Sequence, residues 1–388
     1  MRKSILTVLI LIACAAIGFW LFLDRPAREA PSAAEPQLPA DVLAAQWPAF
    51  KNGGPLRSAT GPLPLRKIPL RWECKLGKGG ESSPVVSKGV VYVGDMTGSV
   101  HAVAMDSGEV KWRFRTESAF SASPLVLGDR VFIGDEDGIV HALSCDDGKP
   151  LWRFEVEDEI HSSANVCGKH IILGAYDSHV YCLRAADGVK VWAFRAEAQI
   201  HAALAVSDGL AFGGGCDHLL RAIDAQAGKE TWSVNVDDVI PTAPVCFDGR
   251  VVIGTMGGRL ACFAVAGGRE EWSREFEEES FYGSPAYAGG VVVIAGKEQV
   301  HCVSADTGEV KWTFAARAGF DSSPAISGDG VYVTGKDGRL HVLHIETGKE
   351  VWSFDAGARI RSSPAIAEGA VLFIDTSGTL YCLSASGK

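Results

Sequence analysis

A run of basic residues is missing from this sequence, which contains 37 lysines and arginines against 47 acidic residues and has a formal net charge of −10. Proteins that bind DNA or RNA need a surplus of Lys and Arg on one face to neutralise phosphates, so no nucleic-acid partner is expected. The ten cysteines form no C-x-x-C or C-x-x-C-H pattern. The sequence therefore gives no support for a zinc site or for covalently attached haem.

Tryptophan, in contrast, recurs with a fixed spacing of 40 residues, at Trp72, Trp112, Trp152, Trp192, Trp232, Trp272, Trp312 and Trp352. Each period is rich in β-branched and aromatic residues and contains glycine in its turns. A period of about 40 residues is typical of propellers built from four-stranded blades. The sequence therefore predicts an all-β protein, an eight-bladed β-propeller with four-stranded antiparallel blades.

The repeat that ends at Trp112 illustrates the expected blade. Short runs of strand-forming residues are separated by turn residues, which predicts four strands. Gly108 precedes the outer strand, where the turn requires a positive φ, and Trp112 is expected to lie flat between adjacent blades. Because only its neighbours cover the apolar faces of a blade, closure of the ring should supply much of the stability.

The two ends of the repeat region complement each other. Trp72 has no inner strands before it, and the last three strands, in residues 363–384, have no Trp after them. A strand at residues 68–76 is therefore expected to complete the C-terminal blade. Counting these four strands as one blade brings the total to eight.

Several cysteines and histidines belong to the repeat itself. Four cysteines follow their tryptophans by 30 residues and are interpreted as small core residues: Cys182, Cys262, Cys302 and Cys382. Equivalent positions on different blades lie too far apart for disulfides, so free buried thiols are expected. Four histidines share a strand position with Tyr181 and Tyr381 and are expected to pack between blades: His101, His141, His301 and His341.

The N-terminus precedes the repeats and is interpreted as a signal anchor, residues 1–23. Arg2 and Lys3 are followed by an uncharged apolar stretch at residues 4–23, which as a helix would reach about 30 Å, enough to span a membrane. The basic flank favours export of the propeller. Residues 24–46, rich in Pro and Ala, are interpreted as a linker, and residues 47–388 as the propeller.

Two alternatives for the N-terminus remain open. The sequence from Leu11 to Cys14 resembles a bacterial lipobox, which would make Cys14 the lipidated first residue of a lipoprotein. Ordinary cleavage near Ala33 is the third possibility. All three place the propeller on the extracytoplasmic, periplasmic side of a membrane.

The repeats resemble the tryptophan-docking motif of the PQQ-type propellers. The residues that carry the resemblance run from Ser304 to Trp312 and from Glu346 to Trp352, and Trp47 to Phe50 with Gly61 is similar to a lead-in segment of that family. The resemblance covers residues 47–388. It implies either a quinoprotein dehydrogenase or a non-enzymatic scaffold similar in build to the propeller lipoprotein of the outer-membrane β-barrel assembly machinery.

The dehydrogenases of this family share features that this sequence lacks. They have long insertions that roof the funnel, an adjacent pair of cysteines beside the quinone, and acidic and amide side chains that hold Ca²⁺. Here no two cysteines adjoin and the blades barely vary in length. We therefore expect no cofactor and favour binding over catalysis, with PQQ and calcium as the alternative.

The positions nine residues after each tryptophan differ from blade to blade. They precede the inner strands and should face the funnel mouth: Glu81, Ser121, His161, His201, Pro241, Phe281 or Tyr282, Asp321 and Arg361. The neighbouring Ser-Ser-Pro positions are largely alike. A binding funnel is expected to have different titratable side chains at equivalent positions of its blades. Solvated loop ends that serve no function would also differ in sequence from blade to blade.

Acidic residues gather in the connections on the same face: Glu155, Glu157, Asp158, Glu159, Asp237, Asp238, Glu277, Glu278 and Glu279. They would give the mouth a negative potential. The expected function is that of a membrane-tethered scaffold whose funnel binds protein or peptide partners in envelope protein assembly. The alternative is a PQQ-dependent oxidoreductase.

Overall fold

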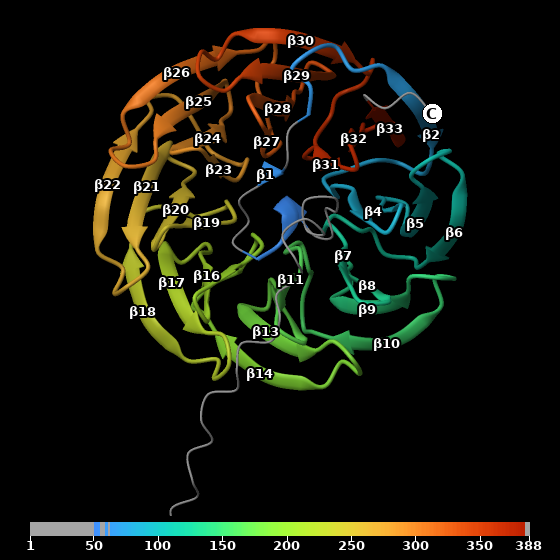
Figure 1. Cartoon of the computed structure of the whole chain (residues 1–388). Coiled ribbons are helices and arrows are strands. Elements are labelled where there is room, and N and C mark those ends of the chain that lie inside the picture. Colours follow the sequence, from blue (N-terminus) through green and yellow to red (C-terminus); the bar gives the residue numbers. More distant parts are fainter. Residues whose placement is uncertain (1–49, 55–58, 61–62, 385–388) are drawn as a thin grey trace, which may run out of the picture. The chain divides into compact units, whose positions relative to one another are not determined.

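The computed structural model describes residues 50–54, 59–60 and 63–384. Eight antiparallel sheets surround a central axis, and each contributes four strands to one blade (Figure 1). Neighbouring inner strands contact one another in a closed ring from β3 through β31 and back to β3. The predicted eight-bladed propeller is confirmed. The predicted membrane helix and linker lie outside the described residues.

The strands are short and recur with the 40-residue period. The inner strands are β3 (Val85–Ser87), β7 (Leu125–Leu127), β11 (Asn165–Cys167), β15 (Ala205–Ser207), β19 (Val245–Phe247), β23 (Ala286–Ala288), β27 (Ala325–Ser327) and β31 (Ala365–Ala367). The second strands are β4 (Val90–Gly94), β8 (Arg130–Gly134), β12 (His170–Gly174), β16 (Leu210–Gly213), β20 (Arg250–Gly254), β24 (Val291–Ala295), β28 (Gly330–Thr334) and β32 (Ala370–Ile374).

The third and outer strands complete each blade. The third strands are β5 (Ser99–Ala104), β9 (Ile139–Ser144), β13 (His179–Arg184), β17 (Leu219–Asp224), β21 (Arg259–Ala264), β25 (Gln299–Ser304), β29 (Arg339–His344) and β33 (Thr379–Ser384). The outer strands are β6 (Val110–Arg115), β10 (Pro150–Glu155), β14 (Lys190–Arg195), β18 (Glu230–Asn235), β22 (Glu270–Glu275), β26 (Val310–Ala315), β30 (Glu350–Asp355) and β2 (Leu70–Lys75).

The burial of the strands follows from face-to-face packing of the blades. The second strand β4 is buried at every residue, because both of its faces lie against other blades. The outer strand β6 alternates, with Trp112 buried and its neighbours exposed. A bulge at Lys111, between the pairs Val110–Val103 and Trp112–Ala102, shifts the register just before the tryptophan.

Each blade is locked to the next through its tryptophan. The indole Nε1 of Trp112 donates to the carbonyl of Cys145, 2.8 Å away on the following blade. The ring lies against Gly148, which has a φ of 70°; a Cβ there would approach Trp112 Cε3 to 2.5 Å. Glycine is therefore required at this position for two reasons, the positive φ and the close contact with the indole ring. The same indole bond occurs from Trp72, Trp152, Trp192, Trp232, Trp272 and Trp312.

The chain closes the ring as its two ends predict. Strand β2 pairs antiparallel with β33, so that Trp72 faces Cys382 and Leu70 faces Leu383. In Figure 1 the blue strand β2 lies beside the red strand β33. The strand predicted at residues 68–76 is therefore confirmed as the outer strand of the C-terminal blade.

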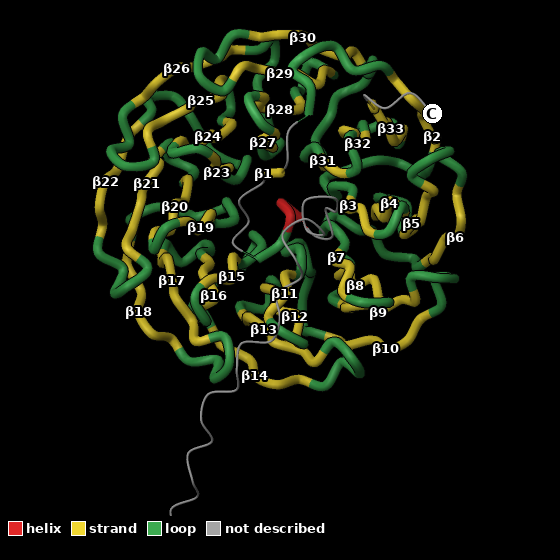
Figure 2. Tube along the Cα trace, in the orientation of Figure 1, coloured by secondary structure: helices red, strands yellow, loops and turns green. Residues whose placement is uncertain are grey.

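A short segment before the repeats occupies the centre of the propeller. The turn η1 (Phe50–Asn52) lies near the axis, as Figure 2 shows in red. Residues 50–54, which we call the channel plug, include four consecutive residues with φ between 50 and 67°. Gly54 exchanges two hydrogen bonds of 2.8 Å with the side chain of Asn165 on β11. Farther along, β1 (Ala59–Thr60) pairs parallel with the inner strand β27.

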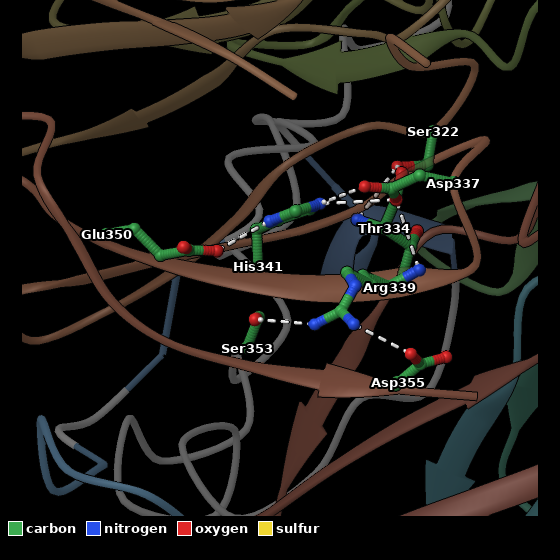
Figure 3. A network of polar contacts seen from close by, with 8 residues as sticks. All are labelled: Ser322, Thr334, Asp337, Arg339, His341, Glu350, Ser353 and Asp355. Carbon is green, nitrogen blue, oxygen red and sulfur yellow. Dashed lines mark hydrogen bonds and ion pairs between the residues drawn. The ribbon is translucent and has the colours of Figure 1, made fainter. Parts of the chain in front are cut away.

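The repeat cysteines and histidines are core residues. Cys182, Cys262, Cys302 and Cys382 are buried free thiols, and burial raises the pKa of each to about 12. Each histidine contacts a carboxylate, a contact that the repeat pattern does not predict. His101 Nε2 lies 2.6 Å from Asp95 Oδ2, and the same contact to an Asp of the preceding turn is made by His141 and His341. His301 instead contacts the buried Glu279, 22 residues earlier in the chain. Figure 3 shows His341 between Asp337 and Glu350.

No helix within residues 50–54, 59–60 and 63–384 has the length and apolar character needed to cross a membrane.

Candidate functional site in the central funnel

A cavity of about 520 Å³ opens on the propeller axis at the ends of the inner strands. Its lining includes the candidate positions from all eight blades: Glu81, Ser121, His161, His201, Pro241, Tyr282, Asp321 and Arg361. Of the two candidates Phe281 and Tyr282, Tyr282 lines the cavity and is 48% exposed, whereas Phe281 is fully buried. The fold thus brings together residues that are far apart in the sequence. We call this cavity the funnel.

Buried hydroxyl groups hold the segments that carry these residues. In the C-terminal blade, Ser362 Oγ donates to the carbonyl of Ile374 and accepts from its amide, at 2.8 and 3.0 Å. Ser322 makes the same pair of bonds with Thr334. Because the hydroxyl follows directly after the funnel residue, it fixes the backbone from which Arg361 or Asp321 projects.

One wall of the funnel carries a chain of polar groups around two histidines. Ser121 Oγ lies 2.8 Å from His161 Nδ1, and His161 Nε2 lies 2.6 Å from a carboxylate oxygen of Glu159. Tyr176 OH lies 2.7 Å from His201 Nδ1. Burial, and then the neighbouring His161, lower the pKa of His201, so that this ring favours the neutral form.

Two residues of this wall, Tyr176 and Glu159, were not predicted from the sequence to line the site. Tyr176 comes from a turn that has no residue of its kind on the other blades, and Glu159 was noted only as one of several acidic loop residues. The presence of a tyrosine at this turn in one blade alone was the sequence feature that could have indicated a site there.

The opposite wall is a cluster of charges. The blade of Asp321 is four blades from that of His161 in a closed ring of eight, which places it across the axis. Asp321 pairs with Lys336 at 3.0 Å and also with Arg359. Arg361 reaches Glu81 at 3.3 Å and Asp321 at 3.8 Å. Burial alone would raise the pKa of Asp321, but Lys336 and Arg359 together lower it.

A ring of serines lies below these walls. Backbone amides donate to serine hydroxyls on the next blade at 2.9 Å, in the order Ala243 to Ser284, Ser284 to Ser323, Ser323 to Ser363, Ser363 to Ser83, Ser83 to Ser123 and Ser123 to Ser163. The series joins the last blade to the first, so it also secures the closure. It is interrupted where the sequence has Ala203 and Ala243.

The channel plug closes the floor of the funnel beside this interruption. Phe50 lines the cavity and packs against the core cluster that includes Ala203 and Ala243. Lys51 is only 2% exposed, and its amine donates to the carbonyl of Pro285. Burial lowers the pKa of Lys51 well below its ordinary value, against a smaller opposing effect of Cys246. The small side chains at Ala203 and Ala243 provide the space for the phenyl ring.

The donor set of the funnel does not fit calcium or a quinone bound through calcium. Ca²⁺ takes six to eight oxygen ligands, but Asp321 is held by Lys336 and Arg359, and Glu81 by Arg361. In the part of the chain that the structure describes, no group of three or more His, Cys, Asp or Glu side chains is placed to hold a metal ion.

Comparison with known proteins agrees with this architecture. A family model described as "Outer membrane protein assembly factor BamB" matches residues 69–168, 136–253, 216–313 and 257–388. The chain shares 18% identity with BamB from Moraxella catarrhalis (TM-score 0.72), over 83% of this chain and 99% of that one. No curated protein sequence matches the chain.

Two further solved structures are similar in fold. A quinohemoprotein alcohol dehydrogenase from Comamonas testosteroni is 13% identical (TM-score 0.78), over 91% of this chain and 83% of that one. The computationally designed Ika8 protein is 17% identical (TM-score 0.72), over 84% of this chain and 100% of that one. Such identities indicate a common fold, which both enzymes and other proteins adopt.

Proposed function

This chain belongs to the family described as outer membrane protein assembly factor BamB, and from that premise we propose that it is a non-catalytic scaffold. In this proposal its funnel binds segments of protein partners on the extracytoplasmic side of a membrane, in the assembly of envelope proteins. The family description and the similar fold of BamB from Moraxella catarrhalis support a role in assembly. The lining of the funnel supports a binding function independently.

The observation that carries the proposal is the contrast between the funnel residues and their neighbours in the repeat. The tryptophans and most of the Ser-Ser-Pro positions are alike because they serve packing. The residues directly before them include Glu, Ser, His, Pro, Tyr, Asp and Arg, and all of these line one cavity. Concave sites with a few polar groups among apolar ones are where proteins bind ligands.

Charge adds a preference for the kind of partner. Three connections that run from an outer strand to the next inner strand are acidic. They carry Glu155, Glu157, Asp158 and Glu159, then Asp237 and Asp238, then Glu277 and Glu278. Their negative potential would raise the rate at which a basic or extended segment meets the funnel. We expect this contribution to weaken as the ionic strength rises.

Membrane attachment through residues 1–23 belongs to the same proposal. An uncleaved anchor, a lipid on Cys14 and cleavage near Ala33 predict different masses for the mature protein. Intact-mass measurement of the membrane-extracted protein distinguishes the three. A mature protein that begins near residue 34 without lipid would exclude tethering by this segment.

The competing function is that of a PQQ-dependent dehydrogenase. The similarity in fold to the alcohol dehydrogenase from Comamonas testosteroni supports this alternative. The ion-paired carboxylates of the funnel speak against it. The purified protein supplied with PQQ and Ca²⁺ should not oxidise alcohols or sugars with an artificial electron acceptor. Turnover that depends on both additions would replace the scaffold proposal with the enzymatic one.

Site-specific photocrosslinking in cells tests the scaffold directly. A photoreactive phenylalanine analogue at Tyr282, in the funnel, should capture a protein partner. The same analogue at Asp329, an exposed residue in the turn at the other end of an inner strand, is the matched control. Capture at Tyr282 but not at Asp329 supports the proposal. Equal capture at both positions, or none at Tyr282, contradicts it.

A further inference from the structure

The funnel is open at its mouth and closed at its floor. Phe50 lines its base, and the residues after it are held in place by Asn165 and by the carbonyl of Pro285. A polypeptide therefore cannot thread through the channel while the plug is seated. What enters must be a chain end or the tip of a loop, and the volume of about 520 Å³ lies within the usual range of ligand pockets.

The lower wall of the funnel offers hydrogen-bond donors that the protein itself does not use. Five hydroxyls each accept a backbone N–H from a neighbouring blade and line the cavity: Ser123, Ser163, Ser284, Ser323 and Ser363. All five residues are at least nine-tenths buried. Within the described ranges none of these five hydroxyls donates a hydrogen bond to another protein group.

Buried donors of this kind favour a ligand rich in acceptors. An O–H group that is buried without a hydrogen-bond partner destabilises the protein, so an occupant that supplies oxygen atoms to these hydroxyls is stabilised. An apolar occupant would leave the hydroxyls unpaired.

The charged wall specifies an anion. Two carboxylates, Asp321 and Glu81, face three cations, Lys336, Arg359 and Arg361, which leaves one positive charge in excess. Arg359 and Arg361 line the cavity, and each side chain is 42% exposed. A guanidinium group binds a carboxylate through parallel N–H bonds. His161 and His201, with Glu159 beside them, lie on the other wall, so a carboxylate is drawn toward the arginines.

From these contacts we infer that the funnel binds the C-terminal carboxylate of a partner polypeptide. This inference rests on the proposed scaffold function and names the part of the partner that is held. The carboxylate lies between Arg359, Arg361 and the serine hydroxyls. The side chain of the last residue packs between the histidine wall and Phe50. The residues that precede it leave through the acidic mouth, which selects neutral or basic ones.

Peptides with and without a terminal charge test the inference. The probes are fluorescein-labelled pentapeptides that share an uncharged Gly/Ser sequence, differ in their last residue, and are made as free acids and as C-terminal amides. Fluorescence anisotropy with the full-length protein should show that the best free acid binds about tenfold or more tightly than its amide, since a hydrogen bond to a charged group has that effect. Arg359→Gln combined with Arg361→Gln should remove this difference.

A matched control separates this effect from a general loss of charge. Arg339→Gln removes an arginine that is 41% exposed and pairs with Asp355 on the outer strand β30, away from the funnel. It should leave the preference for the free acid unchanged. Thermal unfolding of all variants checks that the propeller remains intact.

The outcomes separate this inference from the proposed function. Equal binding of acids and amides, no binding of either, or a preference that survives the double substitution would overturn the carboxylate assignment. If Tyr282 still captures a partner by photocrosslinking, the scaffold function stands and only the inference fails. If Tyr282 captures none, the proposed function fails as well.

Discussion

Substitution of Gly148 by alanine would probe the contact that joins one blade to the next. The new Cβ would meet Trp112 Cε3 at 2.5 Å, and the residue would have to adopt a φ of 70°. The left-handed backbone costs an L-residue about 1–2 kcal/mol. Overpacking against a ring that cannot move away costs about another 1–3 kcal/mol. The expected loss is therefore about 2–5 kcal/mol, the sum of these ranges.

Gly128→Ala is the matched control for this substitution. Gly128 has a φ of 69°, but a Cβ added there meets no atom within 4 Å. It should lose only the backbone contribution, about 1–2 kcal/mol. Urea unfolding followed by circular dichroism measures both variants, and entropy lost from the unfolded chain is common to the two. Equal destabilisation of both variants would refute the claim that tight ring-to-glycine contact locks the blades.

Three further predictions concern the core and the plug. Asp95 is buried, and hydrogen bonds from His101 and Thr97 outweigh its burial and lower its pKa from 3.8 to about 2. Asp95→Asn should therefore lower the free energy of unfolding by about 2 kcal/mol at neutral pH. This difference from the wild type should disappear as the pH drops from about 4 to about 2, because Asp95 then becomes protonated. A difference in stability that does not depend on pH would contradict this prediction. Asn165→Leu removes the side-chain bonds to Gly54 and should speed hydrogen exchange in residues 50–54, and unchanged exchange would disprove the anchoring role. A maleimide should label the exposed Cys216 before the buried Cys302, whose thiol pKa is about 12, and prompt labelling of Cys302 in the folded protein would argue against the packing described.

The sequence was most informative where one residue type does one job in every blade. A tryptophan that docks on the next blade needs a glycine there, so Trp112 and Gly148 recur together and reveal the period. The closure by β2 followed from an outer strand without inner strands at one end and three strands without an outer strand at the other. The location of the funnel residues followed from their equivalent positions in the repeats. Equivalent positions do not, however, predict which side chains contact one another.

The channel plug and the histidine partners could not be derived in this way. The plug precedes the repeats, so no period places it, and its docking depends on single deviations such as Asn165 at a position that is apolar in other blades. The contact of His101 with Asp95 depends on how a turn folds back on its strand. Tyr176 and Glu159 reach the funnel histidines from two different connections, which only the folded chain brings together.

The most direct test of the scaffold account measures how the funnel residues affect binding. The partner captured at Tyr282 is purified and its affinity is measured for wild-type protein and for the variant His161→Ala, Asp321→Ala and Arg361→Ala. The account predicts that affinity falls about tenfold or more while the variant still unfolds cooperatively near the wild-type temperature. An unchanged affinity in the folded triple variant would contradict the assignment of the funnel as the binding site.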